Sequence, residues 1–176
     1  TGEPRWPTVP PALAQPMVSE PGSAMEYSTG SSHLLSAILT RVTGRSTWQF
    51  AQQVLARPLG FTLARWPQDP QGIYFGGNEM RMTPREMVAF AVLHLNGGRA
   101  PNGAQVIPRA WIDSAWVRRT QSGWSGQDYG YGWWIRRSGA HDVYFGWGYG
   151  GQFIFVVPTL DLVVVTTSDP NATNRE

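Results

Sequence analysis

Apolar residues recur at helical spacing in two neighbouring segments of the first third of the chain. In residues 31–43 (SSHLLSAILTRVT), aliphatic side chains at positions 34, 35, 38, 39 and 42 fall on one face of a helix. Gly44 follows the last of them, which is typical of a helix C-terminus. A second helix is predicted to begin at Ser46, a residue type that caps helices, and to end before Pro58. Before both helices, the proline-rich residues 1–21 show no periodicity and predict an extended segment.

The clearest helix signal lies at residues 83–86 (TPRE). An N-cap threonine, a proline at the first helical position and a capping-box glutamate coincide there. The glycines at 97 and 98 predict the end of this helix. A shorter helix is predicted from Pro108, with three apolar positions at Trp111, Ile112 and Ala115.

From Tyr129 onward the pattern becomes typical of β-strands. Strands are predicted at residues 132–136 and 142–145, then at 152–157 (QFIFVV) and 160–167 (LDLVVVTT). The short polar break between the last two predicts a hairpin. Helices followed by antiparallel strands indicate an α+β fold, in which residues 1–128 are mainly helical and 129–176 form the strands of one domain.

The segment GWGYGG at residues 146–151 has the glycine spacing of dinucleotide-binding loops. Such a loop needs a helix directly after it, because the helix N-terminus receives the phosphate. Here a predicted strand follows instead. We therefore interpret the glycines as positions where a strand edge can approach another backbone or a ligand closely.

Composition excludes several function classes. The 176 residues contain no cysteine, which rules out a disulfide, a thiolate metal site or a cysteine nucleophile among them. All 14 basic residues are arginines, so these residues supply no catalytic lysine. The net charge is +2 and the arginines are scattered, which argues against a nucleic-acid partner. No apolar run reaches the length that crosses a membrane.

Histidines and tryptophans suggest no metal site or cofactor. The histidines share no metal-ligand spacing, since two fall in predicted helices and one in a turn (His33, His94 and His141). Nine tryptophans are compatible with a sugar-binding surface or with packing. For the three on predicted helices, packing is favoured (Trp48, Trp111 and Trp116).

Four segments together resemble one enzyme family. Residues 21–46 (PGSAMEYSTGSSHLLSAILTRVTGRS) resemble the second active-site motif of bacterial class C β-lactamases and penicillin-binding-protein-like serine hydrolases. The resemblance continues, in the family's order, through residues 76–99, 129–134 and 146–165. It implies the C-terminal part of a β-lactamase/transpeptidase-like fold. It also implies acyl-enzyme hydrolysis of an ester, amide or β-lactam, in a periplasmic or secreted protein.

The second motif contributes two candidate residues. In the resemblance, Tyr27 matches the tyrosine that acts with a lysine as general base. Thr29 stands where the family has an asparagine that donates to a substrate carbonyl, so a hydroxyl replaces a carboxamide. Ser28, between them, is not a nucleophile candidate.

The third motif contributes a strand edge. Gly146, Trp147 and Gly148 match the family's Lys/His-x-Gly positions, so the cation is absent and a tryptophan lies beside its place. The main-chain N–H of Tyr149 matches the donor that completes the oxyanion hole.

The nucleophile segment is not among these residues. The family's S-x-x-K motif lies upstream of the tyrosine motif, and the chain has no lysine. We therefore expect a C-terminal portion whose partner is the N-terminal remainder of the same protein, and which is inactive in isolation. Carboxylesterase-like activity is favoured, because Gly146 offers no charge and Trp147 beside it offers an apolar wall. The alternative is a non-catalytic module that binds glycan or peptidoglycan.

Overall fold

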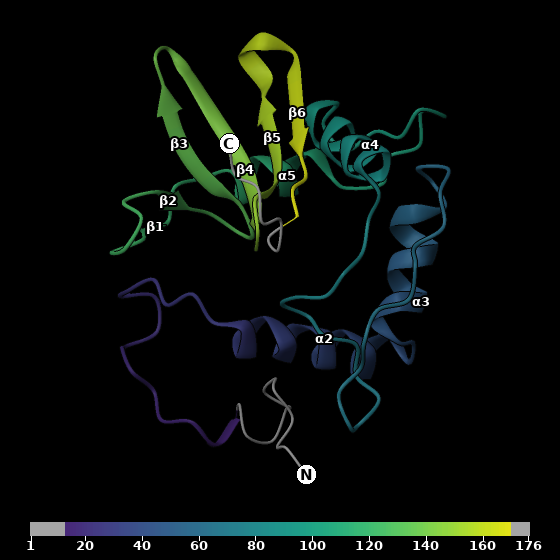
Figure 1. Cartoon of the computed structure of the whole chain (residues 1–176), viewed down its shortest axis with the longest axis vertical. Helices are drawn as coiled ribbons and strands as arrows, with labels where there is room; N and C mark the ends of the chain where they lie inside the picture. Colours follow the sequence, from purple (N-terminus) through teal and green to yellow (C-terminus); the bar gives the residue numbers. More distant parts are fainter. Residues whose placement is uncertain (1–12, 170–176) are drawn as a thin grey trace. The chain divides into compact units, whose positions relative to one another are not determined.

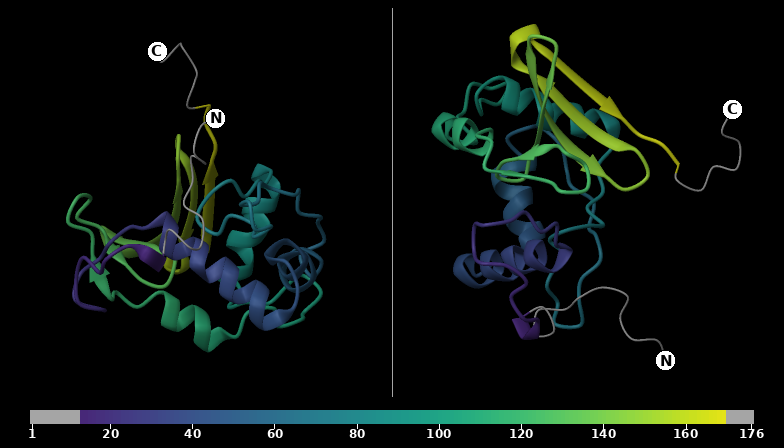
Figure 2. Two further views of the ribbon diagram at one scale, coloured as in Figure 1. Left: turned by 90° about the horizontal axis from the view of Figure 1, so that it is seen from below. Right: turned by 90° about the vertical axis from the view of Figure 1, so that its left-hand side faces the viewer.

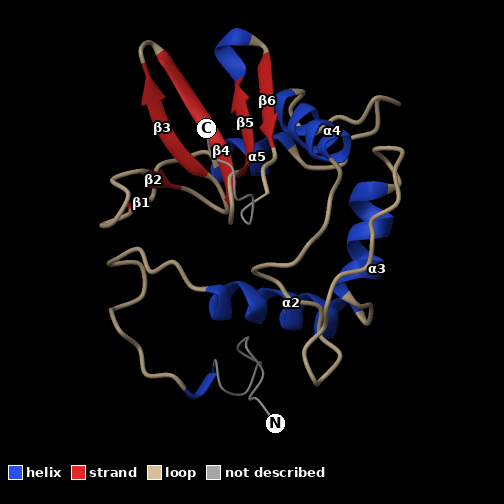
Figure 3. Cartoon of the chain, viewed as in Figure 1, coloured by secondary structure: helices blue, strands red, loops and turns tan. Residues whose placement is uncertain are grey.

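The computed structural model describes residues 13–169, and the chain divides into two compact units, Thr1–Met82 and Thr83–Glu176. Helices come first along the chain and an antiparallel sheet follows (Figure 3), which confirms the predicted α+β class. The first twelve positions of the predicted extended segment lie outside the described residues. Within the described part, no helix combines the length and the apolar character needed to cross a membrane.

Along residues 29–56 of the first unit, two α-helices and a π-helical turn follow one another (Figure 1). α2 spans Thr29–Thr43, α3 spans Thr47–Ala51, and the π-helix η1 spans Gln52–Ala56. Both predicted helices are confirmed. α2 begins at position 29 rather than 31, because the Ser28 side chain caps it by accepting the Ser31 N–H.

The apolar face predicted for α2 is not the face that the first unit buries. The buried residues of this helix are His33 and Ser36, which face the loop of residues 66–77 through hydrogen bonds. Three aliphatic side chains are 68%, 56% and 73% exposed (Leu35, Ile38 and Val42). An exposed apolar stripe of this kind is typical of a surface that contacts another part of a protein.

The second unit opens with the helices that the sequence predicts. α4 spans Pro84–Leu95, and Thr83 and Glu86 form the expected capping box. α5 spans Arg109–Ala115, directly after Pro108. Local capping chemistry therefore fixes the start of α4 as predicted.

Among the described residues of the second unit, six antiparallel strands, each paired with the next, form a sheet. The strands are β1 Thr120–Gln121, β2 Asp128–Tyr129, β3 Trp134–Ser138, β4 His141–Gly148, β5 Gln152–Val157 and β6 Leu162–Thr166. The last four lie close to the predicted strands. The pattern does not predict β1 and β2, because two residues carry no alternation. The prediction of His141 in a turn is wrong, since the turn is confined to positions 139 and 140 and His141 begins β4.

The two faces of the sheet differ in character. α4 packs against β5 and β6 on one face (Figure 2), where the core includes Ala91, Ala115, Trp133 and Val156. Cross-strand partners on the opposite face are mainly aromatic, as the register pairs Trp134 with Phe145 and Phe145 with Phe155. Aromatic cross-strand pairs stabilise a sheet, and here they form one continuous surface.

Candidate functional site

The tyrosine motif lies at the N-terminal end of α2. Tyr27 is 57% exposed and directly precedes Ser28, the N-cap residue, while Thr29 is the first residue of the helix. Ser28 is engaged as a cap: its Oγ accepts the N–H of Ser31 at 3.1 Å. The sequence thus places Tyr27 at the positive end of the helix dipole, where negative charge is favoured.

Two glycines allow the following loop to lie against this helix end. A Cβ on Gly76 would be 2.2 Å from the carbonyl oxygen of Ser32, and one on Gly77 would be 2.9 Å from Cγ2 of Thr29. Gly76 cannot accept a side chain without movement of the backbone, and a side chain on Gly77 would require Thr29 to shift. Residues 76–78 are therefore held next to the tyrosine motif by direct backbone contact.

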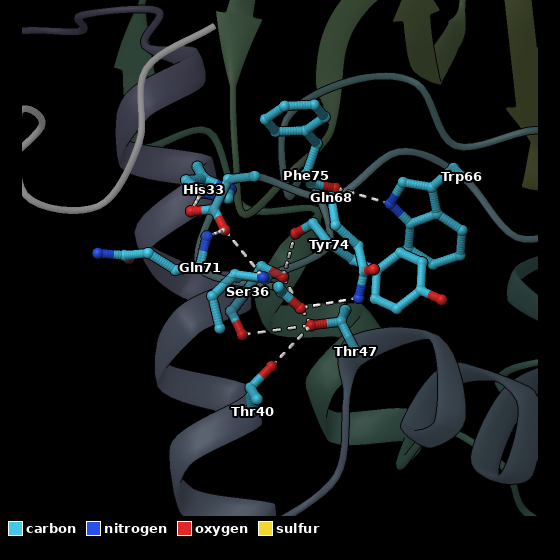
Figure 4. Close-up of polar contacts among 12 residues, drawn as sticks. His33, Ser36, Thr40, Thr47, Trp66, Gln68, Gln71, Tyr74 and Phe75 are labelled. Carbon is cyan, nitrogen blue, oxygen red and sulfur yellow. Dashed lines mark hydrogen bonds and ion pairs between the residues drawn. The ribbon is translucent and has the colours of Figure 1, made fainter. Parts of the chain in front are cut away.

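A buried polar pair anchors the same loop to α2 (Figure 4). The Nε2–H of His33 donates to Oδ2 of Asp69 at 3.1 Å, and the two side chains are 1% and 0% exposed. The other carboxylate oxygen of Asp69 accepts the N–H groups of Gln71 and Ile73, both at 2.9 Å. Asp69 thus ties the turn of its own loop to the helix.

Hydroxyl groups and a tryptophan extend this anchoring. Ser36 Oγ donates to the carbonyl oxygen of Tyr74 at 2.6 Å and lies 2.6 Å from Thr47 Oγ1 (Figure 4). The indole N–H of Trp66 donates to the carbonyl oxygen of Phe75 at 2.9 Å. The loop is consequently fixed at several points, and it presents residues 76–78 in a defined position.

The predicted third motif lies at the end of β4. Gly146, Trp147 and Gly148 pair with β5, opposite Ile154, Phe153 and Gln152 in turn. The pairing of β4 with β3 ends at Phe145, so within the described residues no strand occupies the other edge of these three positions. That free edge is what recognition of a ligand by main-chain groups requires. Tyr149 follows in the turn and is 90% exposed.

Trp147 forms part of an aromatic pocket on the face of the sheet opposite α4. Its ring centre lies 5.4 Å from that of Trp124, 5.7 Å from Trp134 and 5.7 Å from Phe153. The pocket has a volume of about 390 Å³. Trp147 is thus surrounded by aromatic side chains on this face of the sheet.

The same pocket contains an arginine that the sequence analysis did not assign. The guanidinium carbon of Arg136 lies 5.8 Å from the ring centre of Phe145 and 6.0 Å from that of Phe155. These are cation–π distances, so the charge is engaged with the rings. Alternation along β3 predicts which face Arg136 occupies, but the cross-strand register that brings it to Phe155 is a tertiary feature.

The two parts of the predicted site belong to different units. Tyr27 and Thr29 lie in the first unit, and Gly146–Tyr149 lie in the second. That they face one cleft stays a prediction.

The described residues contain no group of three His, Cys, Asp or Glu side chains able to hold a metal ion. His94 is a packing residue: its Nδ1–H donates to the Phe90 carbonyl at 2.9 Å, and burial lowers its pKa.

Comparison with known proteins identifies the family. The sequence model of the Beta-lactamase family matches residues 9–176, and the chain belongs to this family. No curated protein matches the chain. Membership in an enzyme family does not favour the alternative of a glycan-binding module.

Solved structures show the same fold. A Bacillus anthracis protein described as a 6-aminohexanoate-dimer hydrolase is 24% identical, with a TM-score of 0.77 over 88% of this chain. A beta-lactamase from Mycobacterium bovis is 21% identical (TM-score 0.66, 84% of this chain), and an octameric penicillin-binding protein homologue from Pyrococcus abyssi is 16% identical (TM-score 0.68, 84%). The chain spans 40%, 57% and 39% of the lengths of these three proteins, respectively.

Proposed function

We propose that the chain forms part of a serine hydrolase that acts through an acyl-enzyme on neutral carboxylic esters or uncharged amides. The observation that carries the proposal is the third-motif strand edge, which is free of β3 and has Gly146 at the cation position with the Trp147 ring beside it. The anchored loop beside Tyr27 supports it, because catalytic groups need rigid surroundings.

In the proposed reaction, the nucleophilic serine and its lysine come from the N-terminal remainder of the protein. Tyr27 accepts the proton of the serine hydroxyl as the oxygen attacks the substrate carbonyl. The N–H of Tyr149 donates to the developing oxyanion. The proton then passes to the leaving alcohol or amine, and water releases the acyl group.

The preference for neutral substrates follows from charge. A β-lactam brings a carboxylate, and Gly146 offers no cation to receive it. A hydrogen bond to a charged group contributes about 1.5–3 kcal/mol, roughly ten- to a hundredfold in rate. Arg136 lies opposite Val143, three residues before the cation position on β4, and its guanidinium contacts the rings of Phe145 and Phe155.

The test compares p-nitrophenyl butyrate with nitrocefin on the complete protein. We expect kcat/KM to be much higher for the butyrate, and Tyr27→Phe to abolish turnover. Gly146→Lys restores the missing cation in open space, because a Cβ there meets only the Ile154 Cβ at 3.9 Å. This variant should raise the nitrocefin/butyrate ratio about tenfold. A preference for nitrocefin in the unmodified enzyme would refute the proposal.

A further inference from the structure

An unpaired carboxamide lies in the loop beside the tyrosine motif. Neither the amide nitrogen nor the amide oxygen of Asn78 is accessible to solvent, and neither has a hydrogen-bond partner among residues 13–169. An asparagine side chain offers two donors and one acceptor. A buried polar group left unpaired costs about 1–3 kcal/mol. An apolar residue at this position would avoid that cost, so the carboxamide calls for a functional explanation.

The next residue carries a second unfavourable feature. Glu79 has φ 64°, and Asp161 is the one other non-glycine residue with positive φ in the described part of the chain. Asp161 closes the turn between β5 and β6, where such a conformation is common. Glu79, in contrast, lies in a loop and not in a hairpin turn. Left-handed backbone costs a non-glycine residue about 1–2 kcal/mol. Strain of this kind is concentrated at functional sites.

The position of Asn78 relates it to the proposed site. Gly77 touches Thr29 so closely that a Cβ on the glycine would be 2.9 Å from Cγ2 and 3.0 Å from the carbonyl oxygen of Thr29. Consecutive Cα atoms are about 3.8 Å apart. Asn78 therefore directly follows the residue that contacts Thr29. Position 29 is where the resemblance places an asparagine and this chain has a threonine.

We propose that Asn78 is a substrate-recognition residue, which supplies beside Thr29 the carboxamide that position 29 lacks. This inference rests on the proposed function. The amide nitrogen donates to a carbonyl oxygen of the substrate's acyl part, and the amide oxygen accepts an N–H from it. An acyl part that itself contains an amide matches both atoms, whereas a plain alkyl chain matches neither.

The free protein allows this role at low energetic cost. Because the carboxamide makes no hydrogen bond, it loses none when it turns toward a substrate. The loop that carries it is held to α2 through Asp69 and Ser36, so the backbone stays in place while the side chain moves. The preference for an amide-containing acyl part then comes from the hydrogen bonds that it gains with the carboxamide and that a plain alkyl chain cannot make.

The test uses two esters with the same leaving group on the complete protein. These are the p-nitrophenyl esters of N-acetylglycine, which contains an amide, and of butyric acid, which does not. Asn78→Leu keeps a similar volume without polar atoms. We expect it to lower kcat/KM for the N-acetylglycine ester about tenfold, and to leave that for the butyrate within about twofold. Thr29→Asn in the Asn78→Leu background should recover part of the loss.

Stability and binding measurements separate this role from a structural one. Asn78→Leu should keep or raise the Tm, because it removes a buried unpaired group. Equal losses with both esters, or a lowered Tm, would show that the carboxamide only supports the loop and would overturn the proposal. If the unmodified protein hydrolyses neither ester, the proposed function fails. Calorimetric binding of N-acetylglycinamide then decides on Asn78: loss in the Leu variant supports the inference, and equal or absent binding in both proteins refutes it.

Discussion

Replacing Asp69 by alanine removes the acceptor that holds the 66–77 loop against α2. Three hydrogen bonds are lost, from the His33 ring at 3.1 Å and from the N–H groups of Gln71 and Ile73 at 2.9 Å each. Asp69 is only 5% exposed, so water does not easily replace the carboxylate. A buried donor without a partner costs about 1–3 kcal/mol, and we expect a total loss of about 3–5 kcal/mol in unfolding free energy.

Asp69→Asn is the matched control. It keeps one oxygen that can accept the two loop N–H groups, and its amide N–H can donate to Nε2 of His33 once the ring takes the Nδ1–H tautomer, so we expect a loss of about 1 kcal/mol. Urea unfolding followed by circular dichroism gives both values. Hydrogen exchange at the Gln71 and Ile73 amides should accelerate in the alanine variant and stay slow in the asparagine variant. Equal destabilisation by the two variants, or a loss below 1 kcal/mol for alanine, would refute this account of the loop.

Two further predictions concern packing and pH. Gly77→Ala should destabilise the chain by about 1–3 kcal/mol through its contact with Thr29, whereas Gly123→Ala, which meets no atom within 4 Å, should be neutral in the same urea titration. Burial lowers the pKa of His94 from 6.5, so the unfolded chain takes up this proton first as the pH falls. The stability that neutral His94 contributes is therefore full above pH 6.5 and lost as the pH falls toward the lowered value. His94→Gln should flatten the dependence of unfolding free energy on pH below 6.5, and an unchanged slope would contradict this assignment.

Local chemistry explains which parts of the fold could be predicted from the sequence. The N-cap, proline and glutamate at residues 83–86 act within one turn, so α4 begins where the pattern predicts. β5 likewise covers the predicted range, because its β-branched and aromatic residues lie between a glycine turn and Pro158. The start of α2 was predicted two residues late, since three nearby serines can cap and only the structure shows that Ser28 does.

The polar side of the site depends on contacts between distant residues. His33 and Asp69 are 36 positions apart, and no periodicity links a histidine on a helix to an aspartate in a loop. A signal was present, because a histidine between serines and leucines is an unusual choice for a buried helix face, and Asp69-Pro70-Gln71-Gly72 is a turn sequence. Neither feature identifies the partner of the other. Asn78 carried no signal at all beyond its two preceding glycines.

Apolar surfaces in each unit bear on the proposed partner of the chain. In the first unit, α2 exposes an aliphatic stripe while it buries polar residues. In the second, the sheet face opposite α4 exposes side chains of β4 and β6 that are 40%, 41% and 40% accessible (Trp147, Leu162 and Val164). Surfaces of this kind mark contacts with other protein segments. Because the chain spans about half or less of the lengths of the structures that it resembles, the proposed N-terminal remainder fits both surfaces better than a glycan does. A glycan would match exposed rings, but it would leave the aliphatic stripe of α2 uncovered.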